Sequence, residues 1–292
     1  MGGTAGEILS IKFENVSYIY DRKTPFEKEA VSNISFEIKE DEPIAILGRT
    51  GSGKSTILQL MNGIIKPTIG MVEVDGIQTS DKASIVEVRK KIGLVFQYPE
   101  HQFFAENIYE EIAFGPRNFG MNETDIRKLI MDSIMIVGLR PDILSRSPFA
   151  LSGGEQRKVA IASIISCDPK YLIFDEPTSS LDPVSAKKFF DMLKVFQSRG
   201  KSTVMVTHSV EEAITHFKKL LVISDGKIVF YGNSDGLLNE EALESWGLMP
   251  PPMMRVISKV KKECGNLYRL KEKIYSTDSD KFSDIVFRET KK

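Results

Sequence analysis

Cysteines, long apolar runs and net charge are all scarce in this sequence, and each scarcity excludes something. The 292 residues include two cysteines, Cys167 and Cys264, which lie far apart and match no metal-binding spacing, so we expect both thiols to be reduced. No stretch approaches the roughly 18 apolar residues of a membrane-spanning helix. The formal net charge of −1 gives no support for a nucleic-acid partner.

The first residues carry no targeting pattern. Met1 to Glu7 have neither a basic start nor an apolar core, so we expect no signal peptide, and Met1-Gly2 lacks the basic support of a myristoylation site. The cytoplasm is therefore the expected compartment. Apolar residues make up 41% and charged residues 27%, as in an ordinary globular protein, and the length suits one large domain with at most a small appendage.

One glycine-rich stretch fits the pattern G-x-x-x-x-G-K-[ST] of phosphate-binding loops. It consists of Gly48, Arg49, Thr50, Gly51, Ser52, Gly53, Lys54, Ser55 and Thr56. An apolar run over residues 43–47 predicts a buried strand before it, and apolar residues at helical spacing follow it. In this context backbone N–H groups point at phosphate oxygens, Lys54 reaches the β- and γ-phosphates, and the Ser55 hydroxyl ligates Mg²⁺.

Antiparallel strands are expected around this loop. Residues 8–20 and 31–38 alternate apolar and polar side chains, and residues 71–76 predict a third strand ending in an Asp-Gly turn. Tyr18 or Tyr20 can stack on a purine ring or simply pack on a strand face, and their spacing does not decide between these alternatives.

The rest of the chain alternates strands with helices. Buried strands are predicted over 92–96, 171–176 and 203–208, the last two ending in carboxylates and in a histidine, with a helix over 186–198 between them. The remaining predicted elements are a helical insertion over 105–144, broken at Gly115-Pro116 and at Gly120, a helix over 157–166 and a hairpin strand over 227–232. This order predicts a mostly parallel α/β sheet with its site along the carboxyl ends of the strands.

The order and spacing of these motifs resemble those of the ATP-binding cassette (ABC) ATPases over residues 8 to about 235. The matching positions are the Walker A loop at 48–56, the Q-loop glutamine Gln97, the signature at 151–156, the Walker B strand with its following glutamate at 171–176, the D-loop at 180–182 and the switch histidine His208. The chain departs from the usual sequence at Glu155, where glutamine is commoner, and at Asp41, where glycine usually stands.

The resemblance implies an α/β fold with a RecA-like P-loop NTPase core, an N-terminal antiparallel β subdomain and a helical signature subdomain at about 98–166. It places the ABC ATPase domain at 8–235 and a small C-terminal extension at 236–292. The implied ATP-binding residues, besides the phosphate loop, are Tyr20, Ser152, Gly153, Gly154 and Asp182.

The same resemblance implies the chemistry of the site. Glu176 is the candidate general base or water-orienting group, His208 the γ-phosphate sensor, and Lys54 and Gln97 complete the catalytic set. Ser55, Gln97 and Asp175 are the implied Mg²⁺ ligands. For Glu176 alone a surface carboxylate, and for His208 alone a satisfied strand-end histidine, are the alternatives. In the family the signature caps ATP held by the opposite subunit, so a chain with one Walker A loop and one signature is expected to work as a dimer.

Residues 95–104 and 112–120 look like the ATPase subunits of energy-coupling factor (ECF) transporters, most like the second of their two ATPases. That family implies ATP and Mg²⁺ as cofactors and a second ATPase subunit in a heterodimer, with a homodimer as the alternative. It also implies a membrane coupling protein that docks near Gln97 and Tyr98, a substrate-binding membrane protein for a vitamin or metal ion, no nucleic acid, and a peripheral location on the cytoplasmic face of the cell membrane. The alternative for Phe103, Phe104 and Phe114 is core packing.

Other functions carry the same motifs. One is the ATPase of another ABC importer, and another is a soluble ABC ATPase acting on nucleic acid or ribosomes. The latter usually has two cassettes, long heptad insertions or a basic surface, none of which is present. A regulatory nucleotide-binding module without turnover is expected to lose Glu176 or His208, and both are present.

Overall fold

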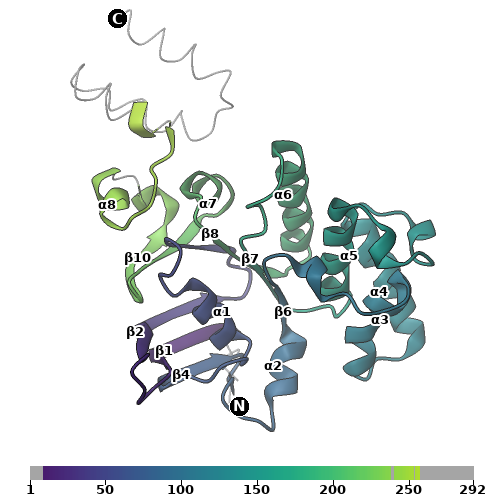
Figure 1. Cartoon of the computed structure of the whole chain (residues 1–292), viewed down its shortest axis with the longest axis horizontal. Coiled ribbons are helices and arrows are strands. Elements are labelled where there is room, and N and C mark those ends of the chain that lie inside the picture. Colours follow the sequence, from purple (N-terminus) through teal and green to yellow (C-terminus); the bar gives the residue numbers. More distant parts are fainter. Residues whose placement is uncertain (1–8, 238–239, 253, 257–292) are drawn as a thin grey trace, which may run out of the picture.

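The protein is described here from a computed structural model, which covers residues 9–237, 240–252 and 254–256 (Figure 1). The strands are β1 (Ser10–Tyr20), β2 (Lys28–Lys39), β3 (Ile44–Leu47), β4 (Ile69–Val74), β5 (Ile77–Gln78), β6 (Ile92–Val95), β7 (Tyr171–Asp175), β8 (Ser202–Thr207), β9 (Lys219–Ser224) and β10 (Lys227–Asn233). The α-helices are α1 (Lys54–Met61), α2 (Ile85–Lys91), α3 (Ile108–Asn118), α4 (Glu123–Ile136), α5 (Gly153–Ile165), α6 (Pro183–Ser198), α7 (Val210–His216) and α8 (Glu240–Ser245). Short 3₁₀ turns are η1 (Pro99–Gln102), η2 (Pro141–Ile143), η3 (Pro148–Ala150) and η4 (Ser234–Leu237).

Two sheets form the framework. The larger has the order β10-β9-β3-β8-β7-β6, in which β9, β3, β8, β7 and β6 pair in parallel and β10 is an antiparallel edge. The smaller has the order β2-β1-β4-β5 and is antiparallel throughout. The predicted mostly parallel α/β sheet with an antiparallel β subdomain is confirmed.

The core divides on the two faces of the larger sheet because successive strand residues point to opposite faces. In β3, Ile44 and Ile46 pack with α1 and the antiparallel sheet, whereas Ala45 and Leu47 pack with the helices α3 to α7. All four β3 residues are buried, as expected for a central parallel strand covered on both faces. Figure 1 shows the antiparallel sheet on one side and α3, α4 and α5 on the other side of the molecule.

The expected break at Gly115-Pro116 is wrong, since both residues lie inside α3. Pro116 has no N–H for the carbonyl of Ile112, one turn earlier. The hydroxyl of the buried Ser166, at the end of α5, donates to that carbonyl at 3.0 Å and shares its hydrogen with the carbonyl of Ser163 at 2.9 Å. A hydrogen bond from another helix therefore lets the helix continue, and α3 ends before Gly120 as expected.

Two further differences concern the C-terminal half. Strand β9 was not among the predicted strands, although it is the hairpin partner of β10 and a parallel neighbour of β3. Beyond residue 235, Leu243, Leu248 and Met254 are buried in the larger core cluster. The domain boundary at 235 stays a prediction, and the basic run at 259–262 together with Cys264 lies outside the described residues. Within the described ranges no helix has the length and apolar character to cross a membrane.

Candidate functional site

The phosphate-loop sequence connects β3 to α1, and its shape depends on two glycines. A Cβ on Gly48 would lie 2.4 Å from both the carbonyl oxygen of Ile223 and the Oγ of Ser52. Gly53 has a φ of 107°, a conformation that favours glycine, and a Cβ there would lie 2.4 Å from the carbonyl of Ala30. The loop can therefore fold tightly over the start of α1 only with glycine at these positions.

The amino end of α1 has no capping side chain and no acidic residue in its first turn. By contrast α3, α4, α5, α6 and α7 each begin with a side chain that caps a backbone N–H. The Ser52 hydroxyl, inside the loop, is buried and has no hydrogen-bond partner among the described residues. N–H groups at a helix start together with an unpartnered buried hydroxyl fit an anionic ligand such as a phosphate.

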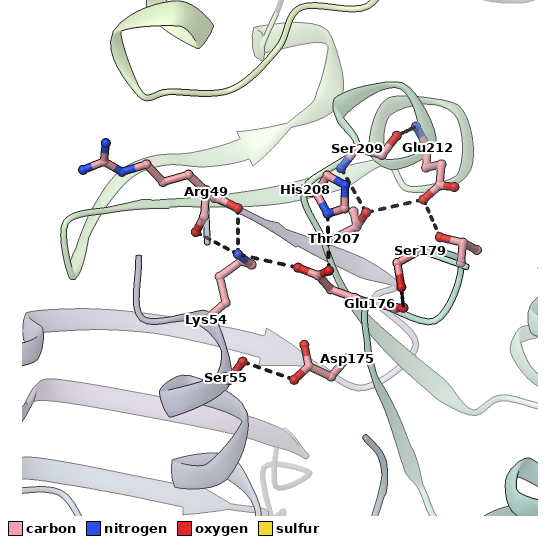
Figure 2. A network of polar contacts seen from close by, with 12 residues as sticks. Arg49, Lys54, Ser55, Asp175, Glu176, Ser179, Thr207, His208, Ser209 and Glu212 are labelled. Carbon is pink, nitrogen blue, oxygen red and sulfur yellow. Dashed lines mark hydrogen bonds and ion pairs between the residues drawn. The ribbon is translucent and has the colours of Figure 1, made fainter. Parts of the chain in front are cut away.

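Lys54 is the first residue of α1 and is buried under the loop. Its Nζ donates hydrogen bonds to the carbonyl oxygens of Gly48 at 2.7 Å and Arg49 at 2.9 Å, and lies 4.0 Å from Oε1 of Glu176 (Figure 2). Burial lowers the pKa of the Lys54 ammonium, against the opposing effect of the carboxylates of Glu176 and Asp175. An anion that replaces the lost hydration of this ammonium would be bound favourably.

Ser55 and Asp175 face each other across the same end of the sheet. The Ser55 hydroxyl donates to Oδ2 of Asp175 at 3.2 Å. Burial raises the pKa of Asp175, and the nearby Glu176 carboxylate adds to this, while the hydrogen bond from Ser55 opposes it. A hydroxyl oxygen and a carboxylate oxygen are the hard ligands that Mg²⁺ prefers, and a cation would stabilise the charged form of the buried Asp175 carboxylate. The pair therefore fits Mg²⁺. The described residues hold no cluster of three or more His, Cys, Asp or Glu able to bind a metal unaided.

Glu176 and His208 follow the neighbouring strands β7 and β8. Oε2 of Glu176 lies 3.3 Å from Nδ1 of His208, and its other oxygen faces Lys54. The Glu176 N–H donates to the carbonyl of Val206 at 2.9 Å, which ties the residue to β8. Glu176 has a φ of 46°, in the left-handed region that a non-glycine residue adopts only where its surroundings enforce it.

Behind this pair is a cavity of about 210 Å³, lined by Glu176, Thr178, Ser179, Thr207, His208, Ser209 and Glu212. Glu212 was not among the predicted site residues. It comes from α7, and its carboxylate accepts hydrogen bonds from the hydroxyls of Thr178 and Thr207. The sequence did hold one signal, since Ser209 and Glu212 form the S-x-x-E pattern of a helix start.

Tyr20 and Gln97, two further predicted site residues, differ in their contacts. Tyr20 ends β1, and its hydroxyl shares a hydrogen bond of 3.2 Å with the hydroxyl of Thr56 in α1. Gln97 follows β6, which pairs with the Walker B strand β7, but it is exposed and has no hydrogen bond with Ser55 or Asp175. The predicted roles of both residues stay predictions.

The signature residues lie apart from this group. Ser152, Gly153 and Gly154 are exposed at the start of α5, and no hydrogen bond or ion pair joins them to the phosphate loop within the described chain. Ser152 caps α5, its hydroxyl donating to Oε2 of Glu155 at 2.7 Å. Asp182 caps α6 and is also exposed. Figure 1 shows α5 and α1 on opposite sides of β6.

The phosphate loop, Lys54, the Ser55–Asp175 pair and the Glu176–His208 pair therefore lie together at the carboxyl ends of β3, β7 and β8. The group offers N–H donors and an ammonium for phosphates, oxygen ligands for a cation, and a carboxylate able to accept a proton. The exposed residues 152–154 at the start of α5, in contrast, take no part in this group.

Comparison with known proteins identifies relatives over most of the chain. The ABC transporter family matches residues 31–179. The energy-coupling factor transporter ATP-binding protein EcfA2 of Clostridium perfringens is 42% identical over 263 residues, 89% of this chain and 92% of the relative. The EcfA2 of Caldanaerobacter subterraneus subsp. tengcongensis is 40% identical over 257 residues, 87% of this chain and 90% of the relative.

Solved structures share the fold. CbiO1 of Clostridium perfringens, described as part of the ABC transporter complex CbiONQ, has a TM-score of 0.72 and 30% identity over 91% of this chain and 98% of that chain. The ATP-binding cassette MJ0796, in a dimeric post-hydrolysis state with ADP and Pi, has a TM-score of 0.69 and 29% identity over 77% of this chain and 98% of that chain.

Proposed function

Because the chain belongs to the energy-coupling factor transporter ATP-binding proteins of the ABC transporter family, we propose that it hydrolyses ATP at the site of Figure 2 to energise uptake of a vitamin or metal ion. The observation that carries this proposal is the gathering of Lys54, the Ser55–Asp175 pair and the Glu176–His208 pair at one edge of the sheet. These groups supply what phosphoryl transfer to water requires.

In the proposed mechanism the loop N–H groups and Lys54 hold the β- and γ-phosphates of ATP. Ser55 and Asp175, with Gln97, are the proposed ligands of Mg²⁺, which when bound neutralises phosphate charge. Glu176 orients a water molecule and accepts its proton as the water oxygen bonds to the γ-phosphorus. The bond between that phosphorus and the bridging oxygen breaks, and ADP and phosphate are the products. His208 holds the Glu176 carboxylate in place and contacts the γ-phosphate.

The separation between the signature and the phosphate loop supports a paired arrangement of subunits. We propose that Ser152, Gly153, Gly154 and Asp182 contact ATP bound to another ATPase subunit. We further propose that the two subunits differ in sequence and form a heterodimer. ATP then acts as a ligand that favours the closed pair, and hydrolysis reopens it.

An exposed pair of aromatic side chains supports docking of a membrane protein. Phe104 and Phe114 are 60% and 47% exposed, and their rings meet edge to face at 4.6 Å between centroids. Tyr98 is also exposed, whereas Phe103 packs against the core. Core packing therefore accounts for Phe103 only. We propose that the two exposed phenylalanines contact the membrane coupling protein, which holds this chain at the cytoplasmic face of the membrane.

The catalytic proposal is tested by Glu176→Gln in the complex assembled with its partner ATPase and membrane components. ATP turnover should fall by about 100-fold or more, because a positioned base contributes about that factor, while ATP binding and the closed pair are retained. Glu211→Gln, which changes an exposed glutamate on α7 outside the site, is the control. Unchanged turnover in Glu176→Gln would refute the role of this residue.

The assembly proposal is tested separately. The chain purified alone should hydrolyse ATP slowly and be stimulated by its partners, whereas full activity of the isolated chain would indicate a self-sufficient homodimer. Phe104→Ala with Phe114→Ala should weaken copurification with the membrane components. Phe26→Ala, another exposed phenylalanine in the loop between β1 and β2, should not.

A further inference from the structure

Glu212 accepts hydrogen bonds from both chain segments that carry the Glu176–His208 pair. Its Oε2 accepts a hydrogen bond from the Thr178 hydroxyl at 2.7 Å and one from the Thr207 hydroxyl at 3.4 Å. Thr178 stands two residues after Glu176, and Thr207 directly precedes His208. A single carboxylate oxygen therefore joins the segment after β7 to the end of β8.

The local sequence predicts a different hydrogen-bond partner for this carboxylate. Ser209 caps α7 and accepts a hydrogen bond from the Glu212 N–H at 3.3 Å. A glutamate at this position commonly turns back to the N–H of the capping residue, as in the complete capping box of α5. In α7 the Ser209 N–H donates instead to the hydroxyl of Thr207 at 3.0 Å. The Glu212 carboxylate is thereby left to reach Thr178 (Figure 2 shows Glu212 turned towards this segment).

The segment that Glu212 holds needs external support. Glu176 adopts the left-handed backbone conformation, which is strained for a non-glycine residue and persists where neighbours enforce it. Its N–H is fixed by Val206, and its carbonyl accepts from the Ser179 hydroxyl at 3.0 Å. Thr178 is buried, and the hydrogen bond from its hydroxyl to Glu212 connects this turn to α7.

We propose that Glu212 is a positioning residue for ATP hydrolysis, which sets the placement of Glu176 relative to His208 by joining Thr178 to Thr207. The inference rests on the roles proposed above for Glu176 and His208. No hydrogen bond or ion pair joins Glu212 to Lys54 or Ser55 among the described residues, so we expect ATP binding to be unchanged when Glu212 is replaced.

Glu212→Ala, in the assembled complex, should lower kcat by about tenfold, the size of one hydrogen bond to a charged group, and leave KM for ATP within about twofold. Glu212→Gln keeps a carbonyl oxygen that accepts the Thr178 hydroxyl, so kcat should stay within about threefold of the unchanged protein. Glu211→Ala, the exposed neighbour on the same helix, is the matched control and should leave kcat unaltered.

A second variant pair keeps the test independent of the folding of Glu212→Ala. Thr178→Val preserves shape but removes the hydroxyl and should lower kcat, by no more than Glu212→Ala does, whereas Thr178→Ser should restore it. Adding Thr178→Val to Glu212→Ala should give no further loss, because the hydrogen bond that Thr178→Val removes is already absent. Additive losses would contradict the proposal.

The melting temperature separates positioning from simple stabilisation. A lowered melting temperature with unchanged kcat in Glu212→Ala, or failure of Glu212→Gln to rescue kcat, would overturn the positioning role. Glu176→Gln in the same assay separates the positioning role of Glu212 from the catalytic role of Glu176. If Glu176→Gln is inactive and Glu212→Ala is fully active, only the proposal for Glu212 fails; if Glu176→Gln keeps its turnover, the catalytic role beneath it fails.

Discussion

Asp75 is the residue whose substitution should change the stability of the fold in the most informative way. Its side chain is 1% exposed, in the turn between β4 and β5. Oδ2 accepts hydrogen bonds from Lys91 at 2.8 Å and Lys170 at 3.3 Å, and Oδ1 accepts one from the Tyr171 hydroxyl at 2.7 Å. The carboxylate thus joins the antiparallel sheet to the end of α2 and the start of β7.

Asp75→Asn isolates the charge of this carboxylate. Asp75 has a φ of 49° and precedes Gly76, and asparagine tolerates that conformation as well as aspartate does. Hydrogen bonds to a charged group contribute about 1.5–3 kcal/mol. The side chains of Lys91 and Lys170 are 31% and 19% exposed and regain water when the charge is lost. We therefore expect the free energy of unfolding to fall by about 2 kcal/mol, less than when a fully buried pair is broken, and the Tm to fall by about 4–8 °C.

The effect should depend on pH in a defined direction. Burial raises the pKa of Asp75, but the hydrogen bonds from Lys91 and Tyr171 and the charge of Lys170 outweigh it and lower the pKa below its usual range. A carboxylate with a lowered pKa stabilises the folded state fully above the pKa of the unfolded chain, near 4, and loses this contribution as the pH falls through the lowered value.

Urea unfolding of the nucleotide-free chain at several pH values measures this contribution. The difference in the free energy of unfolding between the unchanged protein and Asp75→Asn should be largest at neutral pH and shrink below about pH 4. Asp225→Asn is the matched control, because Asp225 also precedes a glycine with positive φ and pairs with Arg49, but in solvent. It should cost less than about 1 kcal/mol. A difference for Asp75→Asn that is the same at acid and neutral pH would refute the reasoning.

Three further substitutions test the phosphate loop and the helical insertion. Lys54→Met should weaken ATP binding by about tenfold or more in nucleotide titrations, because a charge-assisted phosphate contact is lost. Gly48→Ala should lower the Tm and abolish ATP binding, since its Cβ would lie 2.4 Å from a backbone carbonyl oxygen; a normal Tm would contradict this. Ser166→Ala should cost about 1–2 kcal/mol in urea unfolding, because the buried Ile112 carbonyl loses its donor, whereas the control Ser163→Ala should cost less than about 0.5 kcal/mol.

The parts of the fold that the sequence predicts are those encoded locally. The apolar run of β3 followed by the glycine pattern specifies a strand, a loop and a helix within about twenty residues. Asp175 ends β7 and His208 directly follows β8, and the carboxyl ends of parallel strands meet at one edge of a sheet, so the sequence predicts their side chains close together. The predicted mostly parallel sheet depended on the same alternation of strands and helices.

The features that were missed depend on distant partners. Pro116 reads as a helix break unless the donor from Ser166 is known, and that donor comes from another helix. The short apolar run of β9 cannot be told from a helix by its periodicity, and only its pairing with β3 and β10 fixes it as a strand. Glu212 reads as a helix-capping glutamate because nothing in the local pattern shows that its carboxylate reaches Thr178.

The distance between the signature at the start of α5 and the loop at the start of α1 has a genetic consequence. In the pairing proposed above, Ser152 and Lys54 of one chain belong to different catalytic sites. A lesion at Ser152 then damages the site that the partner's phosphate loop forms, while a lesion at Lys54 damages the chain's own. When one subunit carries both lesions, each of the two sites is hit once. When the two lesions are divided between the two subunits, both fall on the same catalytic site and the other site stays intact. The effect of a pair of mutations on ATP hydrolysis therefore depends on whether one gene or both genes carry them.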